Sequence, residues 1–108
     1  MKDDNSFDQS EDDIFENRTK EEIDEAIEEL TDKVWYDRHE KLKGLIEEGK
    51  EEVDPQIWKD ACKAAKKIED KYGLENLGPY DSFEWGMING KLSALRWVVG
   101  FEWDMLDT

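Results

Sequence analysis

The largest group of side chains in this sequence that could do chemistry consists of acidic residues spaced three or four positions apart. They are Glu21, Glu25, Glu28, Glu29 and Asp32. On a helix this spacing brings carboxylates to one face, and their oxygens are the ligands that Mg²⁺ prefers. The same residues also suit the start of a solvated helix, where negative charge meets the positive end of the helix dipole.

A magnesium-dependent enzyme would need a second set of carboxylates. All-α nucleotide pyrophosphohydrolases pair such a helix with carboxylates on a facing helix. Here Asp60 and the pair Glu69-Asp70 have no suitably spaced partner on the apolar side of their helix. The solvated helix start is therefore favoured, and magnesium-dependent nucleotide hydrolysis stays an alternative.

His39 and Cys62 are the remaining side chains with catalytic or metal-binding potential, and each is the only one of its type. Asp32 lies seven residues before His39 on nearly the same helical face, but two ligands do not define a metal site. Cys62 has no identifiable base to activate its thiol. We therefore predict a half-buried structural histidine, no enzymatic activity and no cofactor.

Binding of nucleotides or nucleic acid is also disfavoured. Neither a Gly-x-Gly-x-x-Gly loop nor a Walker-type Gly-Lys-Ser/Thr loop occurs, and the formal net charge is −15. Basic residues do gather at Lys59, Lys63, Lys66 and Lys67. We expect the helix that carries them to face the acidic first helix of its own or another chain.

Length and composition indicate one small domain with a modest core. The chain has 108 residues, 37% of them hydrophobic, with five Trp, four Phe and three Tyr. No apolar run approaches the ~20 residues that span a bilayer. The acidic N-terminus lacks the pattern of a secretory signal, so a cytoplasmic protein with no membrane contact is expected. A single cysteine excludes an internal disulfide.

The fold class predicted from these patterns is all-α, a three-helix bundle with a long first helix. The helices are expected at about 20–48, 55–72 and 82–99. Thr19 with Glu22 and Asp81 with Glu84 have capping-box spacing, Asp54-Pro55 starts the middle helix, and Gly49 can end the first. Residues 1–18 are expected to be a disordered acidic arm, and 19–108 one helical domain with a short helical turn after Gly100.

The first helix carries two apolar stripes about 100° apart. Ile23 to Val34 supply one and Trp35 to Ile46 the other, so the two halves must face different partners, or the helix bends near Val34. The middle helix has one narrow apolar stripe, with Trp58 at its rim and Cys62 further off. That stripe consists of Ile57, Ala61, Ala64, Ala65, Ile68 and Tyr72.

The third helix is apolar nearly all round, which is typical of a buried helix. One side has large residues at helical spacing, which are Trp85, Ile88, Leu92, Leu95 and Val99. The other side has Gly86, Gly90 and Ala94, flanked by Phe83, Met87, Trp97 and Val98. Small residues one turn apart let two helices approach closely. We therefore expect self-association through this side, with Trp35 as a further contact candidate.

The C-terminal quarter of the chain resembles the ending of small uncharacterised prokaryotic and phage proteins. The shared motif is Gly-Lys-Leu-Ser-Ala-Leu-Arg-Trp-Val-Leu-Gly followed by Glu-Trp-Asp and Leu-Asp-Thr. Residues 90–108 match it apart from Val99 and Phe101. The resemblance implies a bacterial, archaeal or viral origin, and it transfers no catalytic or binding residue.

The sequence thus favours a non-enzymatic, self-associating helical module that binds a protein partner it does not identify. One alternative is an acidic mimic of nucleic acid that inhibits a host DNA- or RNA-binding enzyme. The other is the magnesium-dependent hydrolase. Salt adaptation is a further explanation of the acidity that the twelve Lys and three Arg leave open.

Overall fold

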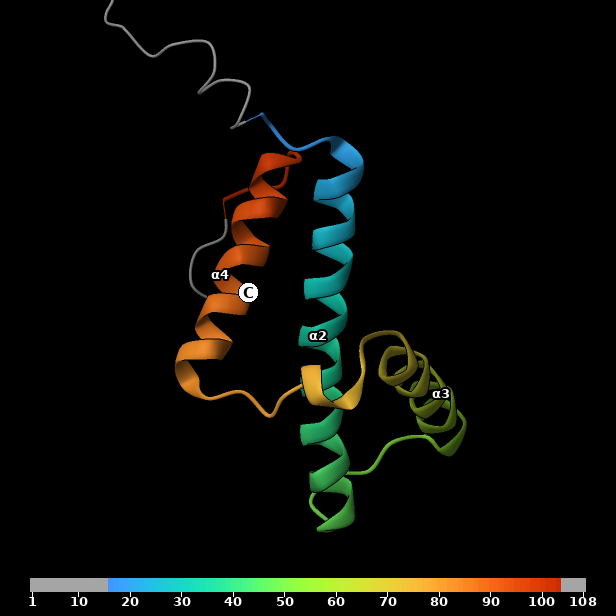
Figure 1. Ribbon diagram of the computed structural model, residues 1–108. Helices are drawn as coiled ribbons and strands as arrows, with labels where there is room; N and C mark the ends of the chain where they lie inside the picture. Colours follow the sequence, from blue (N-terminus) through green and yellow to red (C-terminus); the bar gives the residue numbers. More distant parts are fainter. Residues whose placement is uncertain (1–15, 104–108) are drawn as a thin grey trace, which may run out of the picture.

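The computed structural model describes residues 16–103 and contains three α-helices and one short 3₁₀-helix (Figure 1). They are α2 (Lys20–Glu47), α3 (Pro55–Tyr72), η1 (Leu74–Asn76) and α4 (Ser82–Val98). The predicted all-α class with three helices and a long first helix is confirmed. All six ends of the three helices lie within one residue of their predictions.

Local side-chain hydrogen bonds fix all three helix starts where the sequence placed them. Thr19 and Glu22 form a reciprocal capping box on α2, and Asp81 and Glu84 form one on α4. At α3 the side chain of Asp54, just before Pro55, accepts from the backbone N–H groups of Gln56 and Ile57. Gly49 follows α2 with φ +76°, a conformation that only glycine adopts without strain.

The long helix α2 lies between the other two helices. Figure 1 shows α4 running antiparallel to α2 on one side and α3 crossing α2 on the other. Within the described chain, α3 and α4 do not pack against each other. The core is correspondingly small: its buried hydrophobic residues are Val34, Tyr36, Ala65, Leu77 and Leu92.

The two apolar stripes of α2 have different partners, which confirms the first of the two options predicted for this helix. Ala26 and Leu30 of the first stripe line a groove together with Leu95 of α4. His39 of the second stripe stacks on Trp58 of α3. The change of stripe along the sequence therefore encodes two packing surfaces on one helix.

Most of the predicted stripe of α3 forms its packing face. Ala65 is buried, and Ile68 and Tyr72 pack against the small core. Ile57, which is 63% exposed, and Ala64 are the members of the stripe that remain in solvent. Trp58, predicted at the rim, is partly buried and stacks on His39, which covers more apolar surface than Ile57 offers.

The segments predicted at the two chain ends lie only partly within the described residues. Of the arm predicted at 1–18, only residues 16–18 lie in the described part, and they are exposed. Residues 101–103 are described and are not helical, so the predicted C-terminal turn does not begin there. The rest of that segment lies outside the described residues. None of the described helices is long and apolar enough to cross a membrane.

Candidate interaction surface

The carboxylates considered as magnesium ligands take part in contacts between helices or remain in solvent. Glu28 accepts from Lys71 Nζ at 2.6 Å, and Asp32 accepts from the Tyr72 hydroxyl at 2.8 Å. Glu21 and Glu25 are exposed on α2. Among residues 16–103, no three His, Cys, Asp or Glu side chains come together to hold a metal ion.

His39 lies between two tryptophan rings. Its ring stacks on Trp35 of the same helix at 5.1 Å between centroids, and on Trp58 of α3 at 4.7 Å. It is buried, and this desolvation holds the pKa of His39 below its usual value. The histidine expected to be half-buried is thus buried between two aromatic rings.

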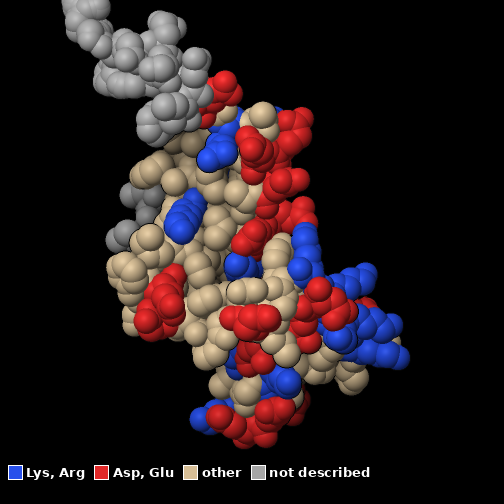
Figure 2. Space-filling model, viewed as in Figure 1, with Lys and Arg blue, Asp and Glu red and all other residues tan. Residues whose placement is uncertain are grey.

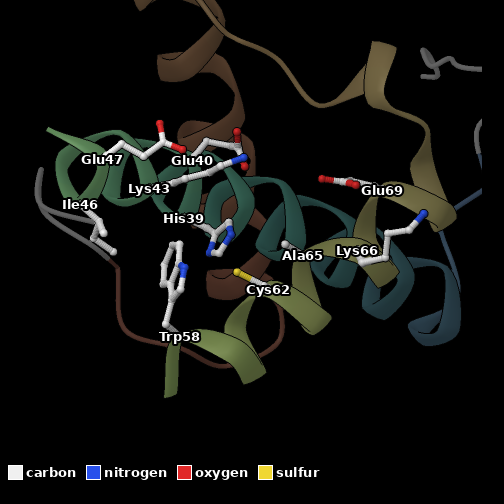
Figure 3. Close-up of a pocket in the computed structure, with 10 residues that line it drawn as sticks. All are labelled: His39, Glu40, Lys43, Ile46, Glu47, Trp58, Cys62, Ala65, Lys66 and Glu69. Atoms are coloured by element: carbon white, nitrogen blue, oxygen red, sulfur yellow. The ribbon is translucent and has the colours of Figure 1, made fainter. Parts of the chain in front are cut away.

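A small open pocket of about 290 Å³ lies beside this stack, between α2 and α3 (Figure 3). His39, Trp58 and Cys62 are three of its lining residues. The others are charged or aliphatic: Glu40, Lys43, Ile46, Glu47, Ala65, Lys66 and Glu69. The sequence placed Cys62 away from the packing face, but the structure puts it at this pocket, with an exposed side chain.

Hydrogen bonds with a charged partner hold α3 against α2. The Tyr36 hydroxyl donates to Glu69 Oε2 at 2.6 Å, next to the small core of Tyr36, Ala65 and Leu77. Burial, followed by this bond to Glu69, raises the pKa of Tyr36 well above its ordinary value. The contact between α2 and α3 is therefore polar at its edges and depends on specific geometry.

The helix predicted to face the acidic first helix does so, but its ion pair to that helix comes from a lysine outside the predicted cluster. Helix α3 does pack on α2, and Lys71 supplies the ion pair to Glu28. Lys66 instead pairs with Asp70 of its own helix at 2.7 Å. Lys59, Lys63 and Lys67 are exposed.

One buried acidic residue was not interpreted from the sequence. Asp37 is 9% exposed, and its Oδ2 lies 2.9 Å from Lys41 Nζ. The same ammonium group lies 4.9 Å from the ring centre of Trp85 on α4. The four-residue spacing of Asp37 and Lys41, on the continuation of the first apolar stripe, was the available signal.

The inner face of α4 packs on α2. Leu92 is 2% exposed and is the most buried side chain of the described chain, and Trp85, Ile88 and Leu95 are partly buried. These are residues of the large-residue side predicted for this helix. Apolar side chains therefore make up the centre of this contact.

The opposite face of α4, here called the outer face, is open to solvent. We define it by Phe83, Gly86, Met87, Gly90, Ala94, Trp97 and Val98. Phe83 is 75% exposed, and Trp97 and Val98 are each 56% exposed. A side-chain carbon built on Gly86 or Gly90 would meet no other part of the chain within 4 Å. The small residues of this face therefore have no packing role within the described chain.

Two features extend the outer face. Trp103, itself exposed, meets Trp97 edge-on at 5.4 Å between ring centres. On the side toward α2, a groove of about 450 Å³ runs past Ala94 and is lined by Ala26 and Leu30 of α2. The apolar surface is therefore broader than the helix itself.

Charge is distributed unevenly between α2 and α4. In Figure 2 acidic side chains crowd the first turns of α2, while the surface over α4 is mostly uncharged. Glu84 and Lys91 are the exposed charged residues within α4. A contiguous apolar patch with a charged border is typical of a protein-protein contact surface.

The structure brings together most of the residues proposed from sequence as contacts. Phe83, Gly86, Gly90, Ala94 and Trp97 share the outer face. Trp35 does not join them, because its ring stacks on His39 at the contact with α3. Met87 and Val98, which the sequence showed only as flanking residues, belong to the same exposed face.

Comparison of the chain with protein-family models, with curated proteins and with solved structures found no match.

Proposed function

We propose that this protein is a non-enzymatic interaction module of prokaryotic or phage origin that binds protein partners through the outer face of α4. Its self-association is part of the proposal, and so is a cytoplasmic location. The observation that carries the proposal is the exposure of Phe83, Met87 and Trp97 on a helix whose opposite face is already packed. Monomeric soluble proteins seldom leave such a patch uncovered.

The contacts that the acidic residues of α2 make with α3 favour a binding role over hydrolysis. Glu28 and Asp32, two of the five carboxylates that a magnesium site would recruit, hold Lys71 and Tyr72 of α3. Using them as metal ligands would break the contact between α2 and α3. Magnesium-dependent hydrolysis is thus the weakest of the three functions considered.

Mimicry of nucleic acid is the second candidate, favoured by one observation. The exposed carboxylates of α2 lie in a row that Figure 2 shows as a continuous acidic surface. Such a surface would bind a basic cleft, and that binding weakens steeply as salt rises. Contact through the apolar outer face should resist salt, so the salt dependence separates the two candidates.

The experiment is site-specific photo-crosslinking in cells of the native host. A photo-reactive amino acid replaces Met87 on the outer face or, as the control, Lys63 on the exposed side of α3. We expect covalent protein adducts from position 87, with this chain or another protein, and few from position 63. Equal or absent labelling at the two positions would contradict the proposal.

A further inference from the structure

We infer that the outer face of α4 binds the same face of a second copy, in an antiparallel pair that crosses at Gly90. This inference rests on the proposed function and names the partner. Three properties of the face support it: its area, its internal symmetry and its charge.

The exposed area matches what one partner contributes to a stable dimer. Phe83, Met87, Trp97, Val98 and the adjoining Trp103 are between 46% and 75% exposed. With side chains of this size, they present roughly 600 Å² of apolar surface. A stable interface takes about 600 to 1,000 Å² from each partner, so the face together with Trp103 reaches the lower limit. The groove beside Ala94 adds to it.

The residues of the outer face are arranged nearly symmetrically about Gly90. Phe83 and Trp97, both large and aromatic, lie seven positions before and after it, and the small Gly86 and Ala94 lie four positions before and after. A two-fold axis through Gly90 of an antiparallel pair sets each residue opposite its counterpart on the other side. Gly90 then faces Gly90, Gly86 faces Ala94, and Phe83 faces Trp97. Such self-complementarity is what a symmetric dimer requires.

Small residues at the crossing point allow the helices to approach closely, and the aromatic residues pack at both ends. A side-chain carbon built on Gly86 or Gly90 would meet nothing within 4 Å among residues 16–103 outside their own helix, so none of these residues has to move for a partner to approach. In a parallel pair Phe83 would face Phe83 and the small residues would also align. Parallel and antiparallel pairs therefore place different residues opposite each other, and the inference specifies the antiparallel pair.

The charge distribution permits association of two copies that each carry −15. The outer face has only Glu84 and Lys91 at its edges, whereas the acidic residues crowd the first turns of α2. Repulsion between the copies is long-range and is screened by salt, while the apolar contact is not. Dimerisation should therefore strengthen as salt increases, which is opposite to binding of a basic partner.

Disulfide trapping of the purified chain tests both the partner and the direction. Cys62 is first replaced by serine, and single cysteines are then placed by Gly86→Cys, Gly90→Cys or Ala94→Cys. We expect Gly90→Cys to form a covalent dimer alone, and the other two variants to form one efficiently only when mixed. Lys63→Cys, exposed on α3, is the control and should form no disulfide-linked dimer.

Light scattering on chains without added cysteines tests the association itself. The Gly90→Glu variant places a charge at the crossing point and should lose the dimer while remaining helical, since no neighbouring atom obstructs the new side chain. Gly44→Glu makes the same change on α2, where space is also open, and should stay dimeric. Circular dichroism verifies that both variants are folded.

The possible outcomes are distinguishable. Efficient trapping of Gly86→Cys alone would show a parallel pair and overturn the inference. A monomeric chain at all salt concentrations would overturn it and the self-association in the proposed function, yet adducts of position 87 with another protein would leave standing the binding of a protein partner through the outer face. A monomer with no adducts at position 87 would remove both.

Discussion

Helices α3 and α4 both pack on α2, but they use their surfaces in different ways. Helix α3 has one packing face, and its contact with α2 includes the stacked His39 and Trp58 rings and the bond from Tyr36 to Glu69. Its other side carries exposed lysines. Helix α4 is apolar on both sides, and α2 covers only the side that contains Leu92.

The difference shows why hydrophobicity alone does not locate a core. Helix α3 packs most of its apolar face within the chain, whereas α4 has more apolar surface than one neighbouring helix can cover. The uncovered apolar surface surrounds Gly86 and Gly90, which have no side chains and leave open space beside the helix. Surplus of this kind on an ordered helix favours a contact with another molecule.

The largest effect is expected where α4 packs on α2. Leu92→Ala should lower the free energy of unfolding by about 2 to 5 kcal/mol, because it leaves a cavity at the most buried side chain. Leu74→Ala is the matched control: this leucine of η1 is 63% exposed and should change stability little. Urea denaturation measures both. Similar losses for the two variants would mean that the inner face of α4 is not a packing surface.

Removing one hydroxyl group at the contact between α3 and α2 should have a smaller effect. Tyr36→Phe removes the hydroxyl that donates to Glu69 and should cost about 1.5 to 3 kcal/mol, the range for a hydrogen bond to a charged group. Tyr80→Phe removes a longer bond of 3.3 Å to the Asn76 carbonyl and should cost less. Equal stability of the two variants would mean that the short bond from Tyr36 to Glu69 contributes no more to stability than the longer bond of Tyr80.

The sequence predicted the elements better than the way they pack. Helix boundaries followed from local chemistry, as with the capping boxes of Thr19 and Asp81, which act within three residues and need no tertiary partner. The division of α2 between two partners was also predictable, because its apolar positions change direction near Val34.

Tertiary contacts decided what the sequence could not. The choice of Trp58 over Ile57 as a packing residue of α3 depends on where His39 lies, which periodicity does not reveal. Likewise, the roles of Glu28 and Asp32 depend on Lys71 and Tyr72, some forty residues further along the chain. The outer face of α4 was predictable because small and large residues follow helical spacing.

The stack of His39 should make the α2–α3 contact sensitive to mild acid. Burial holds the pKa of folded His39 below its usual value of 6.5, so the unfolded chain takes up the proton first as the pH falls. The free energy of unfolding should therefore decrease as the pH drops below 6.5. Nearby Glu40 and Glu69 oppose this lowering of the pKa, and Lys43 adds to it.

His39→Phe keeps an aromatic ring in the stack and removes the titration. Urea denaturation at pH 7.5 and pH 5.5 should show a smaller difference for this variant than for the original chain. The contact of α4 contains no histidine, so Leu92→Ala should leave the pH difference unchanged. An unaltered pH difference in His39→Phe would assign it to other groups.

The smallest effect is expected at the ion pair between Lys71 and Glu28. The bond is short, 2.6 Å, and raises the pKa of the Lys71 ammonium group above its ordinary range. Both side chains are more than half exposed, however, so water and salt screen the attraction, and exposed pairs contribute little to stability. Lys71→Met should therefore move the urea midpoint less than Tyr36→Phe does, and the remaining effect should vanish at high salt. A loss as large as that of Tyr36→Phe, persisting at high salt, would mean that ion pairing rather than buried packing holds α3 on α2.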